Sequence, residues 1–386
     1  MNRFQKINNI AGLILLVIAG FVYWLSMEPT LSFWDCGEFI AASFKLQVGH
    51  QPGAPLFLMI GKLFSLLAAG HNSKVAYWMN FSSVLFSAAT IMFLYWTITL
   101  LASKLFKEEK SLLDILTIVA MGTVGALAYT FSDTFWFSAV EAEVYSLSIL
   151  FTAIVFWAML KWERNADDRW LVLISFIVGL SIGVHLLSLL AIPAVVLIYY
   201  FKKNPSPGFW GTIKAIGISG LIWAVVQFLV IQYTVLFAAK TDLFFVNTLG
   251  TSFGYGAIFF IILLAGTVAY GIFYSIKHKK YNLNLALVCL TFVFFGFSSY
   301  FLIIIRANAK PSLNLSNPDN AYSMYNYLGR TNYGQTPLLY GQTFDANRTD
   351  VKETAMQYRK GEKKYEEIGR DFNVEYDKNL LFPRTY

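Results

Sequence analysis

Charged residues are scarce in this sequence of 386 residues. They make up 14% of the chain, whereas 56% of the residues are hydrophobic and 17% are aromatic. A soluble domain carries roughly 25% charged residues, so this chain cannot cover its own surface with polar groups. The mean hydropathy of +0.53 is that of a protein whose main solvent is lipid.

Cysteine is also rare, and several motifs of soluble enzymes are missing. Cys36 and Cys289 lie in unrelated segments, so they predict neither a disulfide framework nor a metal motif. The sequence contains no Walker loop, no GxGxxG loop, no HExxH helix and no D-x-D triplet. Nothing in it predicts the usual phosphate-loop, dinucleotide, zinc-peptidase or nucleotide-sugar sites.

The net charge of +7 does not indicate a nucleic-acid partner. Basic residues gather mainly in the short segments between apolar runs, where the positive-inside rule places them in membrane proteins. We therefore expect this charge to reflect the orientation of the chain in a membrane, and we expect no nucleic acid among its partners.

Long apolar runs dominate what is present. A helix of about 20 apolar residues crosses the hydrocarbon core of a bilayer, and the period-2 alternation of a membrane barrel is absent. The first run follows MNRFQK and lacks a small-x-small cleavage site, so we expect a retained helix. The sequence predicts an all-α polytopic membrane protein of about nine spans. These spans are approximately 9–27, 77–101, 112–131, 145–160, 170–184, 186–201, 208–233, 256–275 and 283–305.

Lysine and arginine predict the orientation of these spans. All the basic clusters fall on one side only if the N-terminus is cytoplasmic and residues 306–386 are extracytoplasmic. The clusters are Arg3 and Lys6; Lys104, Lys107 and Lys110; Lys161, Arg164 and Arg169; Lys202 and Lys203; and Lys277, Lys279 and Lys280.

The segment Pro55–Ala69 is apolar but is not predicted to span the membrane. It is short, Lys62 interrupts it, and counting it as a span would invert every later loop. We expect an interfacial amphipathic helix there. Residues 28–76 then form a structured external loop.

The last eighty or so residues differ in character from the rest. They are polar, rich in Asn and Tyr, and have few apolar runs, which gives a weak core at best. We expect residues 1–305 to form a transmembrane module, and residues 306–386 to form an extracytoplasmic tail that begins a larger C-terminal domain. No internal repeat is visible, which disfavours an inverted-repeat transporter.

Paired acids in LSFWDCGEFIAASF are the first candidates for chemistry. Asp35 and Glu38 project from one face if the segment is helical. Near the outer membrane surface, one of two neighbouring acids should have a raised pKa, which suits a general base acting on a hydroxyl. The alternative is structural: Asp35 caps a helix and Glu38 completes the capping box. The two interpretations are compatible.

The next external loop, FSDTFWFSAVEAEVYSL, has acids but no lysine or arginine. Asp133, Glu141 and Glu143 would bind a cation, orient an acceptor or be hydrated. Glu141 and Glu143 are two residues apart and point in different directions on a helix, so we expect at most one of them to face a shared site. Trp136 fits an interfacial belt better than a sugar platform.

Two histidines and one arginine complete the set. His50 precedes a Pro-Gly-x-Pro turn and either contacts substrate or is an ordinary turn residue. His185, at an external turn, either binds a phosphate or carboxylate or caps that turn. Arg306 follows the ninth span, where its guanidinium either binds a lipid phosphate or serves as an interfacial anchor. Gly179 and Gly183 are four apart, which favours close helix packing.

These segments together resemble a known family. The order of an N-terminal span, an external helix with paired acids and an interfacial helix resembles the opening of GT-C glycosyltransferases. Similarity is closer to the large bacterial family related to the vertebrate O-mannosyltransferase that modifies plexins, over about residues 15–340. The similar stretches are FWDCGEFIAAS, GHQPGAPLF, FSDTFWFSAVEAEVYSL, GLSIGVHLLSLLAIP and YLGRTNYGQTPL.

The resemblance implies a function. It implies inverting transfer of a mannose-like sugar from a polyprenyl-phosphate donor to Ser or Thr hydroxyls of exported proteins, without metal or cofactor, at the outer face of the bacterial inner membrane. Asp35 would be the base, with Glu38 beside it, and Arg306 and His185 would bind the donor phosphate. His50, Glu141 and Glu143 would position substrate. Many GT-C enzymes have adjacent acids here, whereas this chain has the D-x-x-E spacing of the plexin-type enzymes.

Two other classes of function remain open from the sequence. One is a membrane scaffold or export partner, which would tolerate Asp35→Asn. The other is a lipid or small-molecule transporter, which should carry ionisable residues near the midplane of its spans. The candidate residues cluster instead at the outer ends of the expected spans, which favours chemistry at the surface.

Overall fold

The computed structural model describes residues 3–334, 337 and 339–383. It is mainly helical, and its contacts divide it into two compact units. The first unit contains residues 1–49, 53–230 and 268–314, and the second contains residues 50–52, 231–267 and 315–386. Within the similar stretch YLGRTNYGQTPL, Gln335, Thr336 and Leu338 lie outside the described residues.

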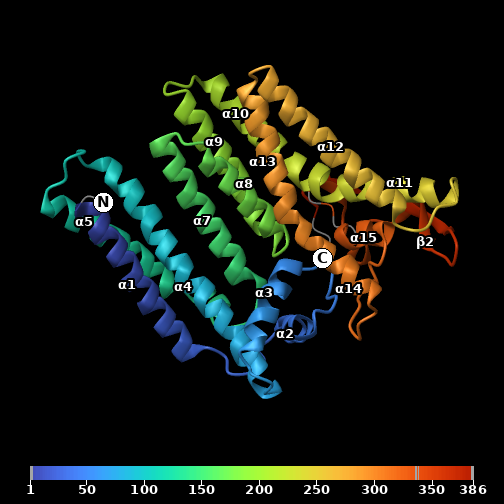
Figure 1. Ribbon diagram of the computed structural model, residues 1–386, viewed down its shortest axis with the longest axis horizontal. Helices are drawn as coiled ribbons and strands as arrows, with labels where there is room; N and C mark the ends of the chain where they lie inside the picture. Colours follow the sequence, from blue (N-terminus) through green and yellow to red (C-terminus); the bar gives the residue numbers. More distant parts are fainter. Residues whose placement is uncertain (1–2, 335–336, 338, 384–386) are drawn as a thin grey trace. The chain divides into compact units, whose positions relative to one another are not determined.

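The first unit is a bundle of long helices. Its first half packs around α4, which contacts α1, α5 and α7 along their lengths, as Figure 1 shows. The helices of this unit are α1 Arg3–Ser26, α2 Cys36–Lys45, α3 Pro55–Leu66, α4 Val75–Ala102, α5 Leu112–Thr130, α6 Asp133–Ala139, α7 Val144–Asn165, α8 Arg169–Ile182, α9 Ala191–Lys203, α10 Phe209–Ala224, α13 Tyr281–Phe297 and α14 Phe301–Asn308.

Among the residues that the structure describes, eight helical stretches are long and apolar enough to cross a membrane by length and composition. They match eight of the nine spans expected from sequence. The ninth, 170–184, corresponds to α8, an apolar helix of 14 residues, which is shorter than a usual span. The eight stretches are Arg3–Ser26, Asn72–Leu105, Leu112–Thr130, Val144–Asn165, Leu186–Lys203, Phe209–Asn247, Tyr255–Lys277 and Tyr281–Asn308.

Gly179 in α8 and Gly183, the residue that caps its end, allow a very close helix crossing. A Cβ on Gly179 would lie 2.3 Å from the carbonyl oxygen of Val293 in α13, and a Cβ on Gly183 would lie 2.3 Å from Ser299 Oγ. Gly296 lies on the other side of the same crossing. The prediction that Gly179 and Gly183 serve packing is confirmed.

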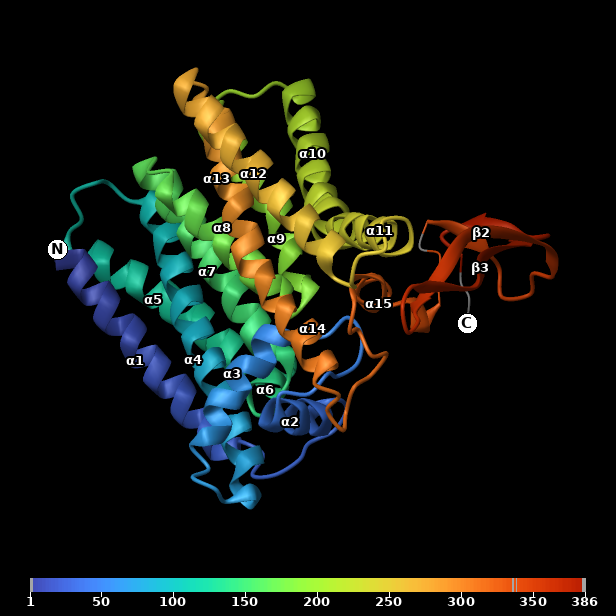
Figure 2. The same cartoon turned by 45° about the vertical axis from the view of Figure 1, so that its right-hand side comes forward.

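Two short helices occupy the segment predicted as a structured external loop. α2 packs against α3, and both contact α4 (Figure 2). Phe39 and Phe57 form an edge-to-face pair at their contact, with ring centroids 5.3 Å apart. Pro55 stands at the start of α3, where a missing N–H costs nothing. The segment predicted to be an interfacial helix is therefore a helix, and its place at the membrane interface stays a prediction.

The second unit contains α11 Thr234–Asn247, the N-terminal part of α12 Tyr255–Lys277, α15 Ala321–Leu328 and four strands. Strands β2 Arg348–Lys360 and β3 Tyr365–Tyr376 form a long antiparallel hairpin, and β1 Tyr340–Gln342 pairs with β4 Asn379–Leu381. The sequence did not predict these strands, because most of their side chains are polar and exposed.

The helix expected to end near residue 233 continues. A π-helical segment, Val225–Tyr233, leads into α11, which ends at Asn247. Lys240 and Asp242 interrupt the apolar run beyond the predicted boundary, within α11. Asp242 is nevertheless 1% exposed, because backbone amides surround its carboxylate.

Candidate functional site

Asp35 stands immediately before α2, in the N-cap position. Its side chain makes no capping hydrogen bond to the helix, and the residue is exposed. The neighbouring Trp34 adopts a left-handed backbone conformation with φ of 58° and is 85% exposed. The capping interpretation is therefore wrong for the Asp35 side chain, since no amide of α2 uses its carboxylate as a cap.

Glu38 lies one turn into α2 and faces Gly49. A Cβ on Gly49 would come within 2.4 Å of Glu38 Oε1. Any side chain at position 49 would therefore displace this carboxylate. Gly49 therefore leaves the space that the Glu38 carboxylate occupies, on the helix that Asp35 precedes.

Glu141 and Glu143 are both buried, at 3% and 5% exposure, and both turn toward the segment around Asp35. Ser32 Oγ donates a hydrogen bond to Glu141 Oε2. Glu143 accepts hydrogen bonds from the backbone amides of Asp35 and Val144, the second at 3.3 Å.

Cys36 joins the two glutamates. Its Sγ lies 3.8 Å from Glu143 Oε1 in a hydrogen bond, and its thiol also bonds Glu141. The expectation that at most one of the two glutamates faces a shared site is wrong. That expectation assumed a helix, whereas residues 140–143 form the turn between α6 and α7, so an i,i+2 pair need not diverge.

Burial makes Glu143 hard to ionise. It raises the pKa of this carboxyl from 4.5 to about 7, and the negative charges of Asp35 and Glu141 add to the rise, while hydrogen bonds from Val144 and Asp35 oppose it. Burial beside the two glutamates also raises the pKa of the Cys36 thiol, which keeps it protonated as a hydrogen-bond donor.

Asn80 fixes the chain that leads from α1 to Asp35. Its Nδ2 donates to the carbonyl oxygens of Glu28 at 2.6 Å and Thr30 at 2.8 Å. Asn80 lies on α4 and is fully buried. Sequence reasoning missed this role, although an amide inside an apolar span was a usable signal, because such a group needs polar partners.

Trp136 anchors the other side of the same region. Its Nε1 donates to Ser26 Oγ at 2.8 Å, and its ring meets Tyr23 at 6.1 Å between centroids. This supports a structural place for Trp136 at the end of α1. Asp133, in the first turn of α6, is exposed.

Arg306 lies at the opposite end of α2 from Asp35. Its Nε donates to the carbonyl oxygen of Leu46 at 2.5 Å and its Nη2 to that of Lys45 at 3.3 Å. Leu46 is the left-handed C-cap of α2. A helix of 10 residues is about 15 Å long, so Arg306 neutralises the C-terminal end of the helix whose N-terminal end carries the acids.

His185 caps the short 3-10 helix Leu186–Leu190. Its Nδ1 accepts a hydrogen bond from the Leu187 amide at 3.2 Å, and its ring packs edge-on against Tyr145. The turn-capping interpretation is confirmed for Nδ1. In the neutral imidazole this bond places the proton on Nε2, which is then a donor.

His50 belongs to the second unit, so only its contacts within that unit are given. Its carbonyl oxygen accepts a hydrogen bond from the hydroxyl of Tyr327 at 3.1 Å. The other six predicted residues all belong to the first unit. Of these, the structure brings together Asp35, Glu141 and Glu143, with Glu38 on the adjoining helix.

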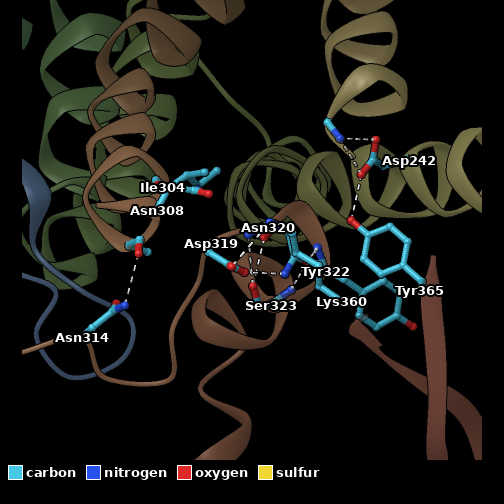
Figure 3. A network of polar contacts seen from close by, with 12 residues as sticks. Asp242, Ile304, Asn308, Asn314, Asp319, Asn320, Tyr322, Ser323, Lys360 and Tyr365 are labelled. Carbon is cyan, nitrogen blue, oxygen red and sulfur yellow. Dashed lines mark hydrogen bonds and ion pairs between the residues drawn. The ribbon is translucent and has the colours of Figure 1, made fainter. Parts of the chain in front are cut away.

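The second unit has a polar core of its own, shown in Figure 3. Asp242 Oδ1 accepts the amides of Gly254 and Gly256 at 2.9 and 3.0 Å, which caps the start of α12. Tyr365 on β3 donates its hydroxyl to Asp242 Oδ2 at 2.8 Å, and its backbone pairs with the side-chain amide of Asn247 through two bonds of 2.8 Å. These bonds hold the hairpin on α11.

Comparison with known proteins supports the resemblance seen in the sequence. Residues 35–207 match a family model described as the protein O-mannosyl-transferase TMEM260 N-terminal domain, and residues 334–386 match a family of unknown function, DUF8416. The first match contains Asp35, Glu38, His50, Glu141, Glu143 and His185, and it ends before Arg306.

Two curated relatives carry the same name. The protein O-mannosyl-transferase tmem260 of Dictyostelium discoideum is 28% identical over 154 residues, which is 40% of this chain and 17% of that protein. The mouse protein O-mannosyl-transferase TMEM260 is 29% identical over 166 residues, 43% of this chain and 21% of that protein. No solved structure matches the chain significantly.

The matches thus cover about a fifth of the relatives' length. They show that this chain is similar, over part of its length, to proteins named protein O-mannosyl-transferase TMEM260. Together with the eight long apolar helices, they identify an integral membrane protein.

Proposed function

We propose that this protein is a glycosyltransferase that moves a mannose-like sugar from a polyprenyl-phosphate donor to Ser or Thr hydroxyls of exported proteins. The observation that carries the proposal is the acid cluster at the start of α2. There the exposed Asp35 is held by a backbone hydrogen bond to the buried Glu143, within the region that matches the O-mannosyl-transferase family model.

Asp35 is the proposed base. Its carboxylate accepts the proton of the acceptor hydroxyl as the hydroxyl oxygen attacks the anomeric carbon. The bond from the anomeric carbon to the phosphate oxygen breaks, and the lipid phosphate leaves with the electron pair, so the configuration inverts. Asp35 suits this task because it is exposed and its side chain is not used to cap α2.

The buried acids position that base. Glu143 receives the Asp35 amide, and Cys36 connects Glu143 with Glu141. Asn80 ties the preceding chain to α4. A base held from several sides loses little freedom when substrate binds, which is how positioning lowers a barrier. In this proposal Glu141 and Glu143 act through Asp35, and Glu38 lies beside the acceptor.

Donor binding is assigned to the cationic side of α2. Arg306 already donates Nε and Nη2 to the carbonyl oxygens that end α2, so in this proposal it meets the donor phosphate through the remaining N–H groups of its guanidinium, as a charge-assisted hydrogen bond rather than as a paired fork. His185 supplies an Nε2–H donor in its neutral form. Stabilisation of the negative charge that develops on the leaving phosphate is usually the largest single contribution to catalysis. The reaction is proposed to need neither metal nor cofactor.

The setting of the reaction follows from the orientation of the chain. The basic clusters predict a cytoplasmic N-terminus, and with that orientation the start of α2 would lie on the extracytoplasmic side. The resemblance to a bacterial family is the reason to propose a bacterial inner membrane. The lipid tail of the donor remains in the bilayer, and exported proteins supply the hydroxyl. The tail from residue 306 onward is proposed to lie on the same side.

Mass spectrometry of exported proteins tests this function. Cells lacking the protein are complemented with the wild type or with Asp35→Asn at equal membrane abundance. Hexose on Ser or Thr should appear only with the wild type. Identical glycosylation in all three strains, or full activity of Asp35→Asn, would contradict the proposal. Retained function of Asp35→Asn in protein export would favour the scaffold alternative.

A further inference from the structure

The first unit contains a cavity at the end of the bundle away from the acid cluster. Its volume is about 530 Å³. Its walls come from the start of α1, the end of α4, the segment that leads into α5, and the ends of α7 and α9. Helices that alternate in direction bring these ends to the same side. The basic clusters predict that this side is cytoplasmic.

Charge in the wall is unbalanced. Five basic and three acidic side chains line the cavity. Lys104 forms an ion pair with Glu163. Arg164 and Lys202 form no ion pair with any residue that the structure describes, although both line the cavity. The cavity is therefore an anion-attracting site with cationic groups that lack an acidic partner in the described chain.

The inner wall is apolar. Ile115 and Leu160 line it and are buried at 3% and 7% exposure, and Phe4 and Leu100 complete it. Lys110 holds its ammonium 5.8 Å from the ring of Phe4, so a cationic and an apolar residue of the lining lie side by side. A ligand that fits has a negatively charged head and an apolar portion next to it.

We propose that this cavity binds the phosphate headgroup of an anionic phospholipid of the cytoplasmic leaflet. A phosphodiester would lie against Arg164 and Lys202, and the adjoining acyl chains would continue along the apolar wall. Basic pockets between membrane helices on the cytoplasmic side suit such headgroups, because the leaflet supplies anionic lipid at high local concentration. The proposal does not depend on the proposed sugar transfer.

A general preference for basic residues at the cytoplasmic end is the competing explanation. If that explanation holds, replacing any lysine at that end should lower lipid retention equally. A binding site predicts a loss only for the residues that line it. Lys203 offers a matched control, because it follows Lys202 directly in α9, carries the same charge and lies outside the cavity lining. Its ammonium lies over the ring of Tyr199 at 5.7 Å.

Native mass spectrometry of the full chain, released from nanodiscs of phosphatidylcholine with a minor share of phosphatidylglycerol, tests the site. The wild type should retain phosphatidylglycerol in preference to phosphatidylcholine. Arg164→Gln and Lys202→Gln should each lower that retention about fivefold, as expected for one cation near an anionic headgroup. Lys203→Gln should leave it unchanged.

A variant that removes negative charge from the cavity keeps the test informative if Arg164→Gln or Lys202→Gln is unstable. Glu108 and Glu109 line the same cavity, and replacing both with Gln should raise phosphatidylglycerol retention. Equal losses from Lys202→Gln and Lys203→Gln, or no change in any variant, would overturn the site. Displacement of the lipid by inorganic phosphate at constant ionic strength would reassign the cavity to a soluble anion and overturn the lipid proposal.

Discussion

The backbone amide of Asp35 donates a hydrogen bond to the buried carboxylate of Glu143. Asp35 precedes α2 and Glu143 precedes α7, so one bond links the starts of two helices that are far apart in sequence. The bond leaves the Asp35 side chain outside the buried cluster. Glu143 is therefore placed to set where the proposed base lies without meeting the substrate itself.

Glu143→Ala should lower kcat about tenfold and leave both KM values nearly unchanged. It removes the acceptor of two backbone amides, and leaving a buried polar group without its partner costs about 1–3 kcal/mol. Glu143→Gln keeps an acceptor oxygen and should retain most of the activity. Steady-state kinetics in nanodiscs distinguish these outcomes. Equal loss in both variants would mean that Glu143 needs its charge and acts on substrate directly.

Stability should depend on pH through the same residue. The folded pKa of Glu143 is raised by burial from 4.5 to about 7. The folded state therefore binds more protons between these values, and stability falls as pH rises from about 4.5 to about 7. The loss is roughly 3 kcal/mol at most. Thermal unfolding from pH 5 to 8 should show this decline in the wild type and a flatter profile in Glu143→Gln.

Arg306→Ala should raise the KM for donor more than the KM for acceptor. It also removes two bonds to the end of α2, so thermal stability should fall by about 1–3 kcal/mol. Lys310→Ala is the control, since Lys310 is an exposed cation on the same segment. A loss of stability with both KM values unchanged would restrict Arg306 to holding the helix.

Tyr365→Phe should destabilise the second unit by about 1–3 kcal/mol, because it removes a donor to the buried Asp242 carboxylate. Limited proteolysis of the hairpin should become faster while the helices of the first unit stay protected. Tyr358→Phe is the control: its ring also meets Tyr322, and its hydroxyl makes no hydrogen bond to the described residues. Equal protection in both variants would contradict the proposed anchor.

Helices were predictable because their evidence is local. A run of apolar residues about 20 long predicts a span wherever it occurs, and eight of the nine expected spans match long helices among the described residues. Gly179 and Gly183 were predictable for the same reason, since their spacing alone places them on one helix face. The hairpin β2–β3 was not, because it is held by Tyr365 contacts to α11 rather than by an apolar pattern of its own.

The acid cluster was only partly predictable. Asp35 and Glu38 stood out as charges in an apolar setting, and so did Glu141 and Glu143. Their meeting depends on the turn before α7 and on Cys36, which the sequence offered only as an isolated cysteine. Arg306 was expected near a phosphate, while its bonds to Lys45 and Leu46 depend on a long-range approach that no local pattern encodes.

Transfer by the purified protein tests the central claim most directly. The full chain in nanodiscs is given polyprenyl-phosphate mannose and an exported acceptor, and hexose on Ser or Thr is measured by mass spectrometry. Asp133→Asn, an exposed acid of the next loop, is the control for Asp35→Asn. The account predicts that Asp35→Asn loses transfer at least a hundredfold with unchanged folding, on the scale of general-base catalysis, while Asp133→Asn stays active. Full transfer by Asp35→Asn would contradict it.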